Sequence, residues 1–191
     1  MFKEIPTVPS IYSSTWNQVL RSTDYRSKII EMNELPIIRK TFNCPISFLT
    51  GCFDSFHRGY DSMLEQARGY VGPNGIVVVG INSDLSVKLQ DKKDVGLKRP
   101  INFEYCRLHR IASHPCVDFT YLFDDKTAVS ALKLLKPDVF MVFSGDNLRD
   151  KPEIVYICES LPNTVLRVNT DIPYGQNGEK ISTSRLIELY S

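Results

Sequence analysis

Residues Leu49–Tyr60 read LTGCFDSFHRGY, and they lie between two contrasting patterns. An apolar run, Ile46–Leu49, comes before the first glycine of this segment. Beyond the second glycine, apolar residues recur at the spacing of a helix, at Tyr60, Met63, Leu64 and Ala67. This order of apolar run, glycine and helical spacing predicts a strand, a tight turn and a helix.

The junction between this strand and helix is a candidate phosphate-binding site. Gly51 lacks a Cβ where the backbone must turn closely. The helix expected after Gly59 begins with unpaired N–H groups and the positive end of its dipole, and both attract anions such as phosphate. His57 lies beside this junction and is the candidate imidazole for phosphate binding.

The segment GCFDSFHRGY, residues 51–60, resembles the G-x-F-D-x-x-H-x-G-H signature of the cytidylyltransferase-like nucleotidyltransferases. Members of that family are small α/β enzymes that join an NTP to a phosphorylated sugar, polyol or cofactor precursor and release pyrophosphate. The resemblance implies that His57 faces the nucleotide phosphates, while Tyr60 stands in place of the second histidine. It implies nucleotide contacts for the other signature positions, Gly51, Cys52, Phe53, Asp54 and Gly59.

Tyr60 has two interpretations. Its phenol can replace the missing imidazole, because the hydroxyl can donate one hydrogen bond. Alternatively, its ring belongs with Met63, Leu64 and Ala67 to the buried face of the helix. Losing one donor to a transition-state oxyanion costs roughly 10²- to 10³-fold in rate, so this exchange slows an enzyme without abolishing its activity.

The resemblance continues after the second expected strand. The run Gly75–Ile81 is apolar and β-branched, which predicts a strand buried on both faces. Asn82-Ser83-Asp84 then matches the N-S-D of the family and adds Asn82 to the nucleotide contacts. The basic segment Lys88–Pro100 is either a solvated loop or a source of lysines for the phosphates. The resemblance favours Lys88, with the pair Lys92-Lys93 as alternatives.

The segment from Arg99 to Arg107 resembles the R-P-x-x-x-x-x-x-R pattern of the sugar-phosphate adenylyltransferase branch. We expect Asn102 to cap the helix that carries Arg107. The family implies that this arginine reaches the substrate phosphates, where its planar fork suits bidentate contact. An exposed helical arginine is the alternative.

Two later segments complete the resemblance. Gly145 and Asp146 match the K-G-x-D-Y or M-G-x-D-W sequence of the family, whose glycine admits the base, and Phe143 stands where the sugar-phosphate branch has a lysine. Near the end of the chain, the sequence resembles the I-S-T-S that opens the family's final helix. This match implies hydroxyl and N–H donors to the phosphates from Ser182, Thr183 and Ser184.

These elements predict an α/β fold, a Rossmann-like parallel sheet of about five strands with helices on both faces. The remaining elements are expected to be strands at Val117–Phe123, Val139–Phe143 and Thr164–Val168 and a helix at Glu153–Ser160. Residues 1–43 are expected to form an N-terminal helical extension of a nucleotidyltransferase domain at 44–191. In this extension we expect one helix capped near Ser13 and a second that ends before Pro36.

Composition and motifs argue against several other classes of protein. Lys and Arg number 23 against 22 Asp and Glu, so no overall charge attracts nucleic acid or a membrane surface. The apolar runs are too short to cross a bilayer and the chain starts without an apolar signal core, so we expect a soluble cytoplasmic protein. Five cysteines without a C-x-x-C pair predict neither a disulfide framework nor a zinc ribbon, and we expect no structural metal. The chain has no P-loop motif, and no G-x-G-x-x-G follows the first strand.

The resemblance therefore leads to a nucleotidyltransferase that uses ATP or CTP, with Mg²⁺, on a sugar or polyol phosphate. Asn177 stands where cytidylyl-type enzymes have the arginine of R-T-E-G, which favours the adenylyltransferase domain of ADP-heptose synthesis over the glycerol-phosphate cytidylyltransferase type. The alternative is a catalytically impaired nucleotide-binding homologue that acts as a regulatory or interaction protein, motivated by Tyr60 and Phe143. A third hypothesis assigns the function to residues 1–43, where Tyr12 and Trp16 fit either packing on the domain or a homodimer contact.

Overall fold

The structure is a computed structural model that describes residues 24–89, 99–143 and 151–169. These residues form a five-stranded sheet in the order β3-β2-β1-β4-β5, and every neighbouring pair of strands is parallel. The strands are β1 (Ile46–Gly51), β2 (Ile76–Asn82), β3 (Phe119–Phe123), β4 (Val139–Val142) and β5 (Val165–Val168). The predicted Rossmann-like parallel sheet is confirmed.

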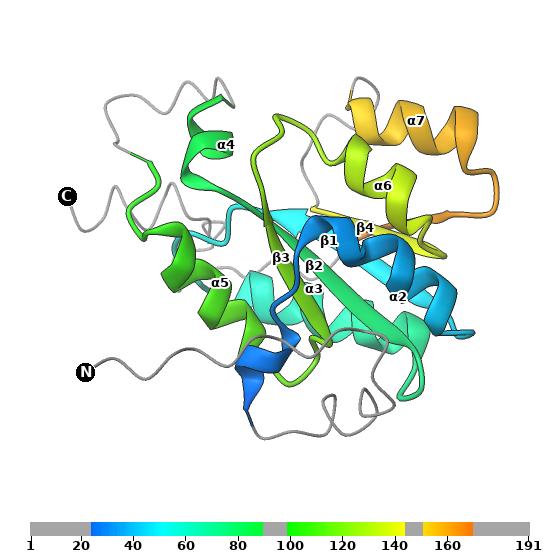
Figure 1. Cartoon of the computed structure of the whole chain (residues 1–191), viewed down its shortest axis with the longest axis horizontal. Coiled ribbons are helices and arrows are strands. Elements are labelled where there is room, and N and C mark those ends of the chain that lie inside the picture. Colours follow the sequence, from blue (N-terminus) through cyan, green and yellow to red (C-terminus); the bar gives the residue numbers. More distant parts are fainter. Residues whose placement is uncertain (1–23, 90–98, 144–150, 170–191) are drawn as a thin grey trace, which may run out of the picture.

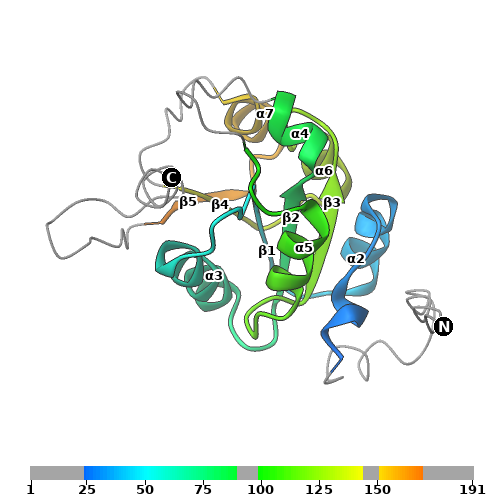
Figure 2. The ribbon, with the colours of Figure 1, turned by 90° about the vertical axis from the view of Figure 1, so that its left-hand side faces the viewer.

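Helices cover both faces of the sheet, as predicted (Figure 1). One face packs against α3 (Arg58–Val71) and α5 (Glu104–Ala112). The other face packs against α2 (Leu35–Thr41), α6 (Val129–Leu135) and α7 (Pro152–Ser160). The short helix α4 (Asp84–Leu89) follows β2, and two 3-10 turns, η1 (Tyr25–Lys28) and η2 (Met32–Glu34), precede α2. Figure 2 shows α3 and α2 on opposite sides of the strands.

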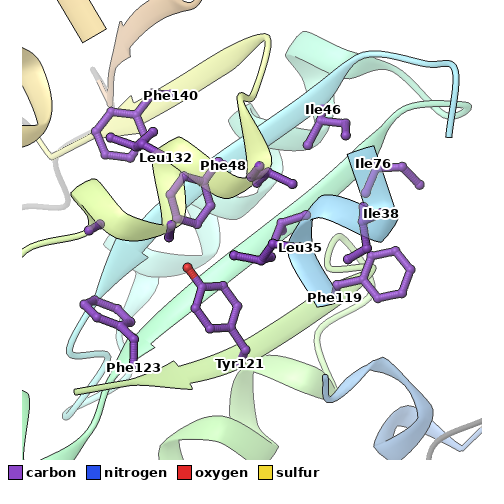
Figure 3. Close-up of a cluster of buried hydrophobic side chains, with 14 of the residues drawn as sticks. Leu35, Ile38, Ile46, Phe48, Ile76, Phe119, Tyr121, Phe123, Leu132 and Phe140 are labelled. Carbon is purple, nitrogen blue, oxygen red and sulfur yellow. The ribbon is translucent and has the colours of Figure 1, made fainter. Parts of the chain in front are cut away.

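Each face of the sheet has its own apolar core. All seven residues of β2 are buried. Because helices cover both faces of this central strand, its sequence is a continuous apolar run rather than an alternation of apolar and polar residues. On the α2 side, Figure 3 shows Leu35 and Ile38 of α2 beside the core residues Phe48 of β1 and Phe119 of β3.

Two aspartates hold the amino ends of the central strands. Asp138, directly before β4, accepts the N–H of Ile46 at 2.8 Å, and Asp118, directly before β3, accepts the N–H of Val77 at 2.7 Å. Each carboxylate also pairs with an arginine, Arg39 and Arg68 respectively. These contacts fix the strands relative to one another, so the loops at their carboxyl ends start from fixed positions.

Part of the expected N-terminal extension belongs to the core. Leu35 and Ile38 are fully buried, and the N–H of Ile30 donates to the carbonyl of Thr120 on β3 at 2.9 Å. This contact covers an edge strand that would otherwise offer unpaired backbone groups. The helix expected near Ser13 lies outside the described residues, and the boundary between residues 43 and 44 stays a prediction.

The prediction that a helix ends before Pro36 is wrong. Instead, α2 begins at Leu35 and Pro36 lies in its first turn. Proline lacks an N–H, and the N–H groups of the first turn have no partner within a helix, so proline starts a helix there without loss. The residues before α2 form η1 and η2 in place of the expected helix.

Truncation of Leu35 tests the contribution of α2 to the core. We expect Leu35→Ala to lower the free energy of unfolding by about 2–5 kcal/mol, because it removes buried methyl groups and leaves a cavity. Urea denaturation followed by circular dichroism measures the change. Leu134→Ala is the matched control, since Leu134 is 36% exposed and its truncation should cost no more than about 1 kcal/mol. Equal losses in the two variants would contradict this role for α2.

Candidate functional site

The loop after β1 turns sharply and leads into α3. Phe53 has a φ of 52°, in the left-handed region, and its side chain is 1% exposed. The ring folds back against Gly51, where a Cβ would lie 3.2 Å from Phe53 Cε2. A Cβ at Gly51 would be crowded by this ring, so glycine suits the close approach, and the predicted order of strand, turn and helix is present.

His57 is the N-cap residue of α3. Its Nδ1 accepts the N–H of Gly59 at 3.1 Å, which satisfies one of the unpaired donors of the first turn. Because Nδ1 is an acceptor, the neutral imidazole carries its proton on Nε2. Burial lowers the pKa of His57 below the ordinary histidine value, although the charge of Asp61 acts in the opposite direction. At neutral pH this side chain is therefore an uncharged hydrogen-bond donor.

Tyr60 lies in an aromatic cluster at the start of α3. It is 9% exposed, and its ring stacks on the imidazole of His57 with centroids 4.3 Å apart. The other rings of the cluster lie 4.9 to 5.6 Å from Tyr60 and belong to Phe53, Phe56 and Phe143. Of the two interpretations of Tyr60, its membership of the buried face of α3 agrees with the structure. Phe143, directly after β4, completes this cluster.

Asp54 joins two segments that the sequence analysis treated separately. Its carboxylate is buried and accepts the N–H groups of Ile101 at 3.0 Å and Asn102 at 2.8 Å. The side chain of Asn102 donates to the carbonyl of Asp54 at 2.7 Å. The prediction that Asn102 caps α5 is wrong, because this side chain is engaged by Asp54 and the N-cap residue is Phe103.

Arg107 is buried and bonds only to protein groups among the described residues. Its Nη1 donates to the carbonyl of Cys52 at 2.6 Å and to that of Asn82 at 2.7 Å. Cys52 directly follows β1, and Asn82 is the last residue of β2. Its Nε donates to the carbonyl of Asn102 at 3.0 Å, and its Nη2 to Asp84 Oδ1 at 2.7 Å. With 1% of its surface exposed, Arg107 is not the exposed arginine of the alternative. The phosphate contact that the family implies for Arg107 stays a prediction.

A sequence signal for the burial of Arg107 exists. Arg107 lies four positions before Ile111 and next to Leu108, and all three residues are buried on α5. At helical spacing, residues i and i+4 share one face, so this pattern places Arg107 on the buried face of the helix. The N-S-D match also contains one partner of Arg107, because its third residue is Asp84, which accepts from Nη2.

The other predicted contacts on β2 and α4 differ in exposure. Asn82 is 5% exposed, and its side-chain amide donates to Ser86 Oγ at 2.9 Å. Lys88, expected in a loop, lies exposed in the last turn of α4. Cys52 is half-buried and Gly59 is buried.

Five of the predicted site residues lie outside the described part of the chain, namely Gly145, Asp146, Ser182, Thr183 and Ser184. The alternatives Lys92 and Lys93 do as well.

Asn169 is a residue near the site that the sequence analysis missed. It is the last described residue, directly after β5, and it is 3% exposed. Its Nδ2 donates to the carbonyl of Gly59 at 3.3 Å, and its Oδ1 accepts from Gln66 Nε2 at 2.8 Å. A single asparagine after a strand carries no sequence signal for this contact. The chain therefore leaves β5 beside the first turn of α3.

The site lies at a characteristic place in the sheet. Strand order reverses between β1 and β4, and the loop with His57 follows the carboxyl end of β1. In open parallel sheets, ligands bind beyond the carboxyl ends of the strands at such a switch point. The fold and this junction define a Rossmann-like α/β protein whose expected ligand position is the start of α3.

Comparison with known proteins identifies the family. The family model described as Cytidylyltransferase-like matches residues 48–189, which is most of the chain. The chain belongs to this family of nucleotidyltransferases, and the resemblance seen in the sequence is confirmed.

Two curated relatives have the same printed name, "Bifunctional protein HldE". The protein from Campylobacter jejuni subsp. doylei is 32% identical over 165 residues, which cover 86% of this chain and 32% of the relative. The protein from C. jejuni subsp. jejuni serotype O:2 is 34% identical over 131 residues, which cover 69% of this chain and 26% of the relative. The chain thus spans about a third or less of the length of these relatives.

Solved structures support the fold. The lipopolysaccharide core biosynthesis protein from Thermoplasma volcanium has a TM-score of 0.56 and 22% identity, covering 69% of this chain and 100% of that chain. Pantothenate synthetase from Thermus thermophilus has a TM-score of 0.56 and 15% identity, covering 84% of this chain and 67% of that chain. At these identities the likeness concerns the fold alone.

Removal of the Asp54 carboxylate should destabilise the loop after β1. We expect Asp54→Ala to lower the free energy of unfolding by about 1–3 kcal/mol or more, because the N–H groups of Ile101 and Asn102 lose a charged acceptor. Urea denaturation measures this loss. Asp124→Ala is the control, because Asp124 is exposed and surface substitutions usually change stability by about 0.5 kcal/mol or less. An effect of Asp54→Ala no larger than the control would refute the link between the two segments.

Acid should destabilise the protein through His57. Its pKa is lowered in the folded state, so the unfolded chain binds the proton more tightly. The resulting stability is present at neutral pH and is lost as the pH falls below about 6.5 towards the folded value. Unfolding measured at about pH 7 and pH 5 should show a larger loss for the wild type than for His57→Asn, which keeps a capping acceptor without titrating in this range. Identical pH dependence of the two proteins would argue against this role of His57.

Proposed function

We propose that this protein is a nucleotidyltransferase that joins an NTP, ATP or CTP, to a sugar or polyol phosphate. In the proposed reaction an oxygen of the substrate phosphate attacks the α-phosphorus of the NTP in line. The bond from the α-phosphorus to the bridging oxygen of the β-phosphate breaks, and pyrophosphate leaves. Family membership, with His57 as an uncharged donor at the start of α3, is the observation that carries this proposal.

His57 has the chemistry that this transfer needs. Nucleotidyl transfer requires little covalent help from the protein and depends on positioning and on stabilising charge at the phosphate oxygens. The Nε2–H of His57 is a neutral donor, and the first turn of α3 adds N–H groups and its dipole. His57 would therefore donate to a phosphate oxygen whose negative charge grows in the transition state.

The course of the chain after β5 supports the proposed contribution of the hydroxyl cluster. Asn169 bonds to Gly59 in the first turn of α3, and Ser182 follows 13 positions later in the chain (182 − 169). A segment of this length can return to the same junction, since each residue spans up to about 3.4 Å. We propose that Ser182, Thr183 and Ser184 bind the same triphosphate as His57.

Further contacts in the proposal follow from the family pattern. Gly145 and Asp146 would accommodate the base, and Lys88 would approach the phosphates as a point charge from the end of α4. Arg107, whose described partners are all protein groups, would act on the site by holding the loop after β1. The pattern from Arg99 to Arg107 favours a phosphorylated sugar as the acceptor.

Mg²⁺ enters the proposal together with the nucleotide. Within the described ranges, no group of three or more His, Cys, Asp or Glu side chains is arranged to bind a metal ion. Mg²⁺ at such sites is commonly held by substrate phosphates and water with one or two carboxylates. The triphosphate would therefore supply most of the ligands.

A cytoplasmic location fits this proposal, since NTPs and phosphorylated sugars are substrates there. None of the described helices has the length and apolar character needed to span a membrane.

A second candidate function is a nucleotide-binding protein without turnover that regulates a partner. Tyr60 and Phe143 support it, because aromatic rings stand where the family has a second histidine and a lysine. Such a protein would bind NTPs and release no pyrophosphate.

Pyrophosphate release separates the two candidates. The protein is incubated with each of the four common NTPs and a panel of sugar and polyol phosphates. We expect release with ATP or CTP only when an acceptor is present, and a fall in kcat/KM of about 10²- to 10³-fold for His57→Ala. His109→Ala is the control, since His109 lies on α5 with its ring 5.8 Å from that of Tyr25. NTP binding without release, with release appearing in Tyr60→His, would instead favour the regulatory protein.

A further inference from the structure

His57 and Tyr60, at the ends of the H-x-G-Y segment, are in direct contact. Their rings stack with centroids 4.3 Å apart and an angle of 27° between their planes. Tyr60 in turn is held between Phe53, with centroids 4.9 Å apart, and Phe143, at 5.4 Å. One face of the imidazole is therefore covered by a ring that belongs to the core.

The hydrogen bond to Nδ1 fixes the remaining freedom of the imidazole. The N–H of Gly59 occupies Nδ1 at 3.1 Å, so the stacked ring has one tautomer, with the proton on Nε2. Within residues 24–89, 99–143 and 151–169, no hydrogen bond to Nε2 is found. This nitrogen is the donor that remains for a ligand.

We propose that Tyr60 is a positioning residue, whose ring holds the imidazole of His57 in the orientation that directs Nε2–H to the ligand. The contribution to turnover rests on the proposed function, whereas the effect on His57 does not. Tyr60 acts through His57 and does not itself contact the reacting atoms. On this view, the chain replaces the second histidine of the signature with a ring that orders the first.

Asp61 on α3 is the charged group that acts on His57 among the described residues, and it raises the pKa of His57, opposite to the effect of burial. Asp61 Oδ1 also lies 3.5 Å from Nε2 of His114, and Arg110 of α5 lies over the ring of Phe56. A substitution at Tyr60 leaves the charge of Asp61 unchanged, and the charged residue Arg110 and His114 contact Phe56 rather than the stacked pair.

Nuclear magnetic resonance of histidine-labelled protein tests the effect on His57 without any substrate. Long-range correlations of the ring nitrogens identify the tautomer, and a pH titration gives the pKa. We expect Tyr60→Leu to mix the two tautomers and to move the pKa of His57 up towards its ordinary value, because without the stacked ring the imidazole can turn away from the N–H of Gly59 and into solvent. Tyr60→Phe should leave both unchanged. Tyr70→Leu is the matched control, because Tyr70 lies on α3 and is 47% exposed.

Kinetics test the contribution to turnover. We expect kcat to fall about 10- to 100-fold in Tyr60→Leu with little change in the KM for the NTP, since a displaced donor affects the transition state most. Tyr60→Phe should keep kcat within about threefold of the wild type. Thermal unfolding checks that each variant is folded, and Tyr60→Met, with a flexible side chain that fills gaps, serves if the leucine variant is not.

Three results would decide against the proposal or separate it from the proposed function. An unchanged tautomer and pKa of His57 in folded Tyr60→Leu or Tyr60→Met would overturn the proposal. An equal loss of kcat in Tyr60→Phe would also overturn it, because the hydroxyl rather than the stacked ring would then matter. If the wild type releases no pyrophosphate but His57 changes as expected, the positioning by Tyr60 stands and the proposed transferase activity fails.

Discussion

The arrangement of the candidate site depends on two buried charged side chains, Asp54 and Arg107. Arg107 donates to the carbonyl of Cys52, directly after β1, and to the carbonyl of Asn82, at the end of β2. Asp54 accepts from the backbone of the segment before α5. A buried polar group left without its hydrogen-bond partner costs about 1–3 kcal/mol, and more where a charged group is involved, so this network tolerates little change. Because the loop after β1 is held at both of these residues, His57 and the start of α3 have a defined position relative to the sheet.

The central strands could be predicted from the sequence. The hydrogen-bond partner of a single polar residue, or the side of a helix end on which a proline lies, could not. The apolar run of β2 has one physical explanation, burial on both faces of a parallel sheet. Asn102 had several possible partners, and the one it has, Asp54, lies 48 positions away. Pro36 can end one helix or start another, and the burial of Leu35 and Ile38 against the core determines that it starts α2. Such choices are made by tertiary contacts that local patterns do not contain.

For the candidate site, too, the sequence predicted the local junction but not the contacts between distant segments. The signature located His57 and the strand–turn–helix junction, because glycines and a helix start impose a local geometry. The environment of Tyr60 depends on Phe143, which directly follows β4 and is far from Tyr60 in the sequence, so the sequence alone left a donor and a core residue as equal interpretations. Tyr60 and Phe143 belong to one aromatic cluster that contacts His57, and this cluster gives the site of this chain its particular character.

A crystal structure of the protein with a non-hydrolysable analogue of ATP or CTP tests the central claim most directly. The account predicts a phosphate oxygen within about 3.2 Å of His57 Nε2 and of an N–H at the start of α3, with Ser182–Ser184 in contact with the same triphosphate. A nucleotide bound away from α3, or a junction filled by apolar side chains while the analogue binds elsewhere, would contradict it.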